Sequence, residues 1–166
     1  AQSAPDFWER ISPDQITLSG GAEWQVEPLV YSAFTLDYDQ IVQHLGNAPR
    51  EFTAAARSRT FQVTLPLADG KKEVFTVVKT RVMDATLEAL HPEIGTYAGQ
   101  SVQTPGMQLR ITVTPGWGFQ GFITRGDKGI EYIAPVALGQ NKFYMIYDRV
   151  NLPLDSRKGQ LPTLNL

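Results

Sequence analysis

The fold is decided by one stretch of sequence, Phe61–Val82, which reads FQVTLPLADGKKEVFTVVKTRV. Phe61, Val63 and Leu65 alternate with polar residues, which is typical of a β-strand with one buried face. An Asp-Gly pair at 69–70 then favours a tight turn, after which residues 74–82 return as a second strand. The pattern predicts an antiparallel hairpin that belongs to the central sheet, because its apolar face must be covered.

Further strands are expected on both sides of this hairpin. Apolar residues alternate again from Met107 to Val113, and three more apolar segments follow, at 119–124, 130–136 and 143–150. Glycine-containing turns separate them at Gly116, 126–129 and 139–141. Upstream, residues 24–36 are expected to form one or two strands with a break near Pro28.

Two short helices are predicted between the strands. Asp37 is a suitable N-cap for a helix whose apolar residues are Tyr38, Ile41, Val42 and Leu45, with Gly46 as its left-handed terminating residue. Asp84 is the corresponding N-cap of a second helix, which ends before Pro92. The expected fold is therefore α+β, a single domain made predominantly of antiparallel β-sheet with two short helices.

Three segments are distinguished along the chain. Residues 1–21 are rich in proline, serine and glycine and are expected to form an N-terminal arm that lies against the body. Residues 22–150 make up the body. Residues 151–166 combine turn-forming and charged residues with two prolines, and we interpret them as a C-terminal linker or tail.

Composition excludes several functional classes. The chain has 166 residues, 42% of them hydrophobic, and no cysteine, so it contains no disulfide, thiolate zinc ligand or thiol nucleophile. No apolar run reaches the length of about 18 residues that a membrane helix needs. The chain begins with Ala1-Gln2-Ser3-Ala4, as after signal-peptide cleavage, although trimming of a longer chain gives the same start. We expect a secreted or extracytoplasmic protein.

Charge is distributed unevenly along the chain. The net charge is −2 overall, but residues 1–49 carry seven acids and one base, whereas residues 50–81 carry seven bases and three acids. Such a balance gives no general attraction for nucleic acid or a membrane surface. Neutralisation of one segment by the other in the fold is favoured over a docking surface for a partner.

Motifs that would carry catalysis are missing from the sequence. His44 and His91 are 47 residues apart and form no zinc-binding pair, and packing or capping roles are favoured for both. No Gly-x-Ser-x-Gly or phosphate-binding loop occurs. Arg125-Gly126-Asp127 matches an adhesion tripeptide but is explained by a hairpin turn. We expect no catalytic residue, no metal site and no cofactor in this chain.

Aromatic residues gather between Pro115 and Phe122. Trp117, Phe119 and Phe122 are the aromatic members of this segment. Aromatic side chains of this kind can stack on carbohydrate, but sheet cores use the same residues. Core packing is the favoured interpretation, with a carbohydrate-binding face as the alternative.

Several short phrases occur in order over about residues 30–150, and the most specific of them is Pro-Glu-Ile-x-Thr-Tyr-x-Gly. The phrases are Phe34–Asp37, Leu45–Pro49, Val63–Gly70, Phe75, Val82-Met83, His91–Gly99, Gly118-Phe119 and Tyr132–Pro135. Together they resemble the N-terminal pro-domains of secreted bacterial zinc metallopeptidases of the reprolysin-like, metzincin type.

The resemblance implies a non-catalytic fragment of a precursor. Its partner would be the cognate zinc metallopeptidase catalytic domain, which carries the zinc and the histidine motif, and the pro-domain would assist folding and maintain latency. Many metzincins use a cysteine thiolate on the zinc, which this chain lacks. Either a carboxylate replaces the thiolate, with Asp127, Asp148 and Asp155 as candidates, or the cover is steric.

The same resemblance implies maturation by proteolysis near the C-terminal tail. Basic residues in exposed, turn-rich chain are the usual cleavage points, and Arg149, Arg157 and Lys158 are the candidates. An alternative function is a secreted β-rich binding module for carbohydrate or a surface protein.

Overall fold

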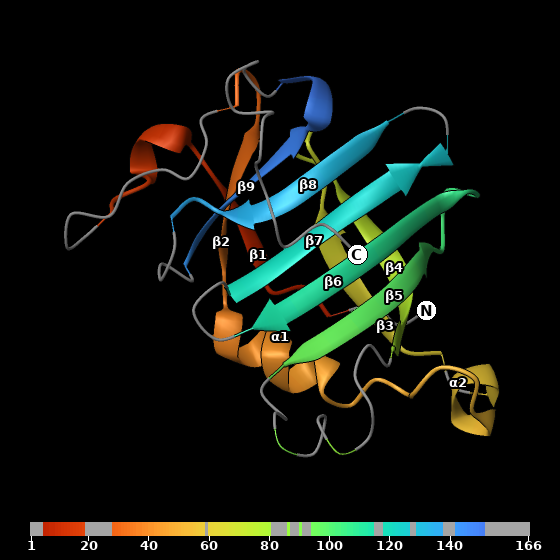
Figure 1. The fold of residues 1–166 in the computed structure, drawn as a ribbon. Coiled ribbons are helices and arrows are strands. Elements are labelled where there is room, and N and C mark those ends of the chain that lie inside the picture. Colours follow the sequence, from red (N-terminus) through yellow and green to blue (C-terminus); the bar gives the residue numbers. More distant parts are fainter. Residues whose placement is uncertain are drawn as a thin grey trace.

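A computed structural model describes residues 5–18, 28–58, 60–80, 94–114, 118–126, 129–137 and 142–151, together with Thr86 and Leu90. These residues form one nine-stranded sheet in the order β1-β2-β9-β8-β7-β6-β5-β4-β3, with every pairing antiparallel. The strands are β1 (Trp8–Ile11), β2 (Ser32–Leu36), β3 (Gln62–Pro66), β4 (Lys72–Lys79), β5 (Gly95–Ser101), β6 (Met107–Thr114), β7 (Gly118–Arg125), β8 (Ile130–Pro135) and β9 (Phe143–Asp148). The helices are α1 (Tyr38–Leu45), α2 (Ala54–Ser58) and the 3₁₀ turns η1 (Pro13–Gln15) and η3 (Arg149–Asn151) (Figure 1).

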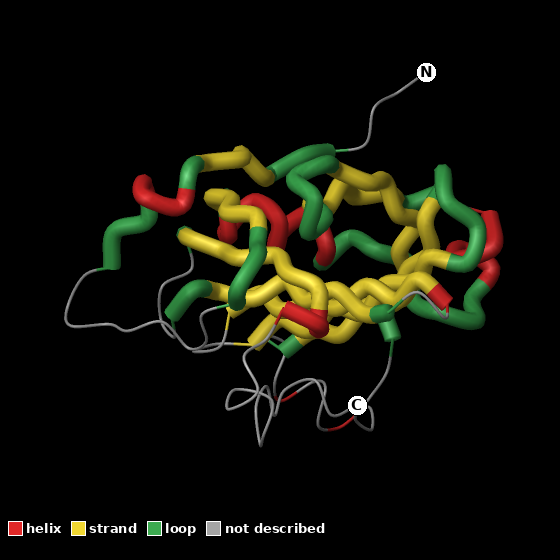
Figure 2. The backbone as a smooth tube through the Cα atoms, turned by 90° about the horizontal axis from the view of Figure 1, so that it is seen from above, coloured by secondary structure: helices red, strands yellow, loops and turns green. Residues whose placement is uncertain are grey.

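The sheet curls until its two outermost strands meet. The Thr64 N–H of β3 donates to the Pro5 carbonyl oxygen at 3.0 Å, just ahead of β1. Lys72 strengthens the same seam, because its ammonium lies 2.6 Å from the Asp6 carboxylate and 2.9 Å from the Trp8 carbonyl oxygen. The result is a nearly closed barrel, whose strands lie in two layers in the view of Figure 2.

Alternation of side chains fills the barrel with apolar residues. Trp8 of β1 is only 4% exposed, and its indole lies edge-on to Phe34, Phe119 and Tyr144, with ring centroids 5.4–6.5 Å apart. The segment expected to be an arm thus contributes a strand and a core residue to the sheet. Burial of aromatic side chains of this size is among the largest apolar contributions to folding.

Strand β9 is buried on both faces. Its inward residues, Tyr144 and Ile146, belong to the barrel core. Its outward residues, Phe143, Met145 and Tyr147, form a second cluster that packs against Ile11, Ile16, Leu18, Tyr31 and Tyr132. The N-terminal segment therefore covers the outside of the barrel after it leaves β1.

Helix α1 closes one end of the barrel, which we call the helix end. Asp37 caps the helix as predicted, with its carboxylate accepting from the Gln40 N–H at 3.3 Å, and Ile41 and Leu45 are fully buried. The expected left-handed ending is wrong, because Gly46 is a right-handed C-cap with φ −60°. None of the described helices has both the length and the apolar character to cross a bilayer.

The predicted fold class, α+β with a dominant antiparallel sheet and two short helices, is confirmed. The predicted hairpin of β3 and β4 is present, with Val63 opposite Phe75, and Gly70 adopts the positive φ of 87° that its turn requires. Helix α2 was not predicted. The helix expected from Asp84 lies outside the described residues except for Thr86 and Leu90, which are both helical.

Strand β5 was also not predicted as a strand, and its sequence explains why. Gly95–Ser101 has two glycines and few β-branched residues, so its strand propensity is low. Packing overrides this propensity at Gly99, where a Cβ would lie 2.7 Å from the Thr76 carbonyl oxygen of β4. The close approach of β4 to β5 therefore requires glycine at this position.

The two oppositely charged segments of the chain meet at the seam. Asp6 from the acidic part and Lys72 from the basic part form the ion pair that joins β1 to the β3–β4 hairpin. The expectation that these segments neutralise each other is confirmed at this contact. Both side chains are about one-third exposed, so the pair adds little free energy and mainly fixes the pairing of the segments.

Phe75→Ala tests the assignment of the hairpin to the core. Phe75 is fully buried, so the substitution should lower the free energy of unfolding by about 3–5 kcal/mol through lost burial and a cavity. Phe52→Ala is a matched control, since Phe52 is 87% exposed and its loss should change stability by less than about 0.5 kcal/mol. Urea titration of both variants measures the difference, and similar losses would contradict the described packing.

Candidate functional site at the exit end of the barrel

The barrel end opposite α1 is where the chain leaves the sheet. Strand β9 ends there at Asp148 and continues into η3, which lies at the opposite end of the sheet from α1 (Figure 1). We call this the exit end. The β3–β4 and β7–β8 turns meet here, so residues from distant parts of the chain surround the barrel mouth.

Glu131 ties these turns together. Its side chain is buried, one carboxylate oxygen accepts from the Ala68 N–H at 2.8 Å, and the other pairs with the Arg125 guanidinium. The neighbouring Leu67 carbonyl oxygen accepts from the Ser32 hydroxyl at 2.9 Å. The β3–β4 turn is thereby attached to β8 and β2 and crosses the barrel mouth.

Burial raises the pKa of the Glu131 carboxyl above its usual value of 4.5. The Ala68 N–H and the Arg125 charge lower this pKa, whereas the Asp69 and Asp148 carboxylates raise it. Because the net shift is upward, the folded state binds a proton at Glu131 more readily than the unfolded chain does. Ionisation of Glu131 therefore lowers the free energy of unfolding at neutral pH.

A second buried carboxylate, Glu73, also serves the fold. It accepts from the Thr104 hydroxyl at 2.7 Å and from the Ser101 hydroxyl, and so holds the β5–β6 turn. The carboxylates of Glu131 and Glu73 are thus engaged with donors of the barrel itself. No group of three or more metal-ligating side chains occurs within the described part of the chain.

Two residues proposed from sequence lie at this end. Asp148 is half-buried, pairs in register with Glu131, and accepts from the Val150 N–H at 3.0 Å, so it caps η3. Arg149 follows it and is exposed. The other two latency candidates, Asp127 and Asp155, and the other two cleavage candidates, Arg157 and Lys158, lie outside the described residues.

An apolar patch beside Asp148 was missed from the sequence. Leu29, Val30 and Val150 are 73%, 62% and 70% exposed, and the Leu29 N–H donates to the Asn151 carbonyl oxygen at 2.7 Å. We call these three residues the exit patch. Exposed aliphatic groups that gather in this way mark contact surfaces. Sequence alone placed residues 28–30 only at a strand break, so it gave no reason to join them to Val150.

The aromatic segment divides between two surfaces. Phe119 is fully buried in the barrel core, which confirms the favoured interpretation for this residue. Phe122 instead faces outward and is half-buried. Residues 115–117 lie outside the described residues, and His44, on α1, stacks on Phe61 at 4.5 Å as a packing residue.

Comparison of the chain with protein-family models, with curated protein sequences and with solved structures finds no match. The likeness to metzincin pro-domains therefore depends on the phrases quoted above.

Glu131→Gln removes the titration at the exit end and keeps an oxygen that can accept from Ala68. The difference in free energy of unfolding, wild type minus variant, should increase as the pH falls from neutral towards about 4.5, because wild-type Glu131 becomes neutral in the folded state over this range. Urea titrations of both proteins at several pH values in that range measure this difference in free energy of unfolding. If the difference stays constant or decreases as the pH falls, burial does not destabilise the ionised form of Glu131.

Proposed function

We propose that this chain is the non-catalytic pro-domain of a secreted zinc metallopeptidase precursor. It would assist folding of the catalytic domain and keep that domain inactive. The observation that carries the proposal is the exit patch, an exposed apolar surface at the point where the chain leaves the barrel. The chain that joins such a catalytic domain to the barrel would leave the sheet beside this surface.

The phrases that resemble metzincin pro-domains lie at positions where the fold restricts which residue can be present, and this supports the proposal. The described part of the most specific phrase forms β5, and its last glycine, Gly99, is required by the approach of β4. The phrase around Asp69-Gly70 forms the turn that Glu131 holds across the barrel mouth. A relative that shared these phrases would share the same structural constraints.

Steric cover is the form of latency that the exit end favours over a zinc bond through Asp148. One Asp148 oxygen holds the Val150 N–H, and the side chain is half-buried beside Glu131. To be ligated by the other Asp148 oxygen, a zinc ion of another domain would have to approach this half-buried side chain. The exit patch, in contrast, is already exposed and needs no rearrangement.

The test is inhibition of the cognate mature protease by the separate domain. The wild-type domain should inhibit, and Val150→Glu should weaken inhibition at least tenfold, or about 1.4 kcal/mol, because a carboxylate would be buried in the contact. Phe52→Glu is the control, since Phe52 is also exposed but lies beside the β4 strand terminus at the helix end. Absence of inhibition by the wild type would overturn the proposal, and equal inhibition by both variants would place the contact elsewhere.

Substitution of the carboxylates separates the two forms of latency. Asp148→Asn should leave the inhibition constant within tenfold, because steric cover does not depend on its charge. The same measurement with Asp127→Asn and Asp155→Asn covers the remaining candidates. A loss of tenfold or more in any one of the three would support a carboxylate on the zinc and contradict purely steric cover.

A further inference from the structure

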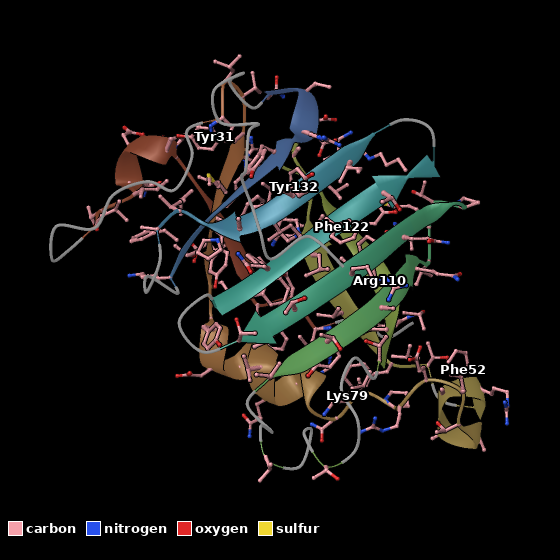
Figure 3. The ribbon with its side chains drawn as sticks, viewed as in Figure 1. Tyr31, Phe52, Lys79, Arg110, Phe122 and Tyr132 are labelled. Atoms are coloured by element: carbon pink, nitrogen blue, oxygen red, sulfur yellow. The ribbon has the colours of Figure 1, made fainter. Side chains whose placement is uncertain are left out.

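The outer face of the barrel carries a row of side chains in register across five strands. Val78 of β4 is opposite Ala98 of β5, which is opposite Arg110 of β6. Arg110 is in turn opposite Phe122 of β7, and Phe122 is opposite Tyr132 of β8. Directly paired residues share a face of a sheet, so these side chains are neighbours on the outside. Figure 3 shows three of them, Arg110, Phe122 and Tyr132, on adjacent strands.

A groove lies at one end of this row. It has a volume of about 430 Å³, and its floor is made by Ala98 and the backbone of Gly99. The small residues of β5 leave this space between the longer side chains of β4 and β6. Hydrogen-bonding side chains border the groove, namely Thr76, Gln100, Gln108 and Arg110.

Arg110 is the one charged side chain among the described outward-facing residues of β5 to β8. It is exposed, and no described acidic side chain forms an ion pair with it. Its outward neighbours are amides, hydroxyls and aromatic rings. A single cation in a neutral polar field does not suit a polyanion such as nucleic acid, which needs several phosphate contacts.

We propose that this outer face binds an acidic oligosaccharide, with a uronic acid carboxylate on Arg110. A guanidinium binds a carboxylate through two parallel hydrogen bonds, which gives both affinity and orientation. The groove's Gln100, Gln108 and Thr76 supply donors and acceptors for sugar hydroxyls. Phe122, directly opposite Arg110, presents a half-buried ring on which the apolar face of a sugar can stack.

An acidic peptide fits this face less well. Extended peptides gain affinity mainly by pairing their backbone with a free strand edge. In β5 to β8 each strand is paired on both sides, so the face offers side chains but no free backbone ladder. Sugar hydroxyls, in contrast, are satisfied by amide and hydroxyl side chains. The inference is independent of the proposed pro-domain function.

The test is titration calorimetry of the full chain with a galactose tetramer in which one unit is replaced by galacturonic acid, so that the ligand carries a single carboxylate. The tetramer should bind, and Arg110→Gln and Phe122→Ala should each weaken binding at least tenfold. Arg57→Gln is the matched control, because Arg57 is an exposed arginine on α2, outside the face. A neutral galactose tetramer should bind at least tenfold more weakly than the acidic one.

Unchanged thermal unfolding of Arg110→Gln, expected because Arg110 is exposed, shows that a loss of binding is not a loss of folding. Three results would each overturn the proposal. They are absence of saturable binding of the acidic tetramer, equal binding by wild type and Arg110→Gln, and equal or tighter binding of a glutamate tetrapeptide.

Discussion

Closure of the sheet between β1 and β3 is the constraint on which the rest of the molecule depends. The Thr64–Pro5 hydrogen bond and the contacts of Lys72 with Asp6 and Trp8 join strands that are far apart in the sheet order. Closure brings Trp8 against Phe34, Phe119 and Tyr144 in the centre of the core. Without it, β1 would be held in the sheet by β2 alone, and two sheet edges would be left unpaired.

A closed barrel leaves only its ends and its outside for function. At the helix end, α1 fills the opening with Ile41 and Leu45. At the exit end, the carboxylates of Glu131 and Glu73 accept hydrogen bonds from residues of the barrel's own turns. Their role there is to hold these turns in place. Among the described residues, two exposed surfaces bear the proposals, namely the exit patch beside Asn151 and the polar outer face around Arg110. Both proposals follow from this division.

Local signals in the sequence predicted local structure well. The Asp-Gly turn, the alternation in β3 and β4 and the Asp37 cap each depend on neighbouring residues, and each was confirmed. Strand β5 could not be predicted, because its glycines are explained only by the approach of β4. The seam, the exit patch and the Arg110 row all join residues from separate strands, and no spacing in the sequence encodes such contacts. Asp148 lies at the end of the last strand, and its capping bond to Val150 was not foreseen.

Amide hydrogen exchange at Thr64 tests barrel closure most directly. Thr64 lies on β3, the last strand in the sheet order, and its N–H points to Pro5 rather than to open solvent. If the barrel is closed, this amide should exchange as slowly as that of Val77, which is bonded to the Phe61 carbonyl oxygen at 2.8 Å inside the hairpin. Exchange of Thr64 at the rate of an unprotected amide, with Val77 still protected, would show an open sheet and contradict the account.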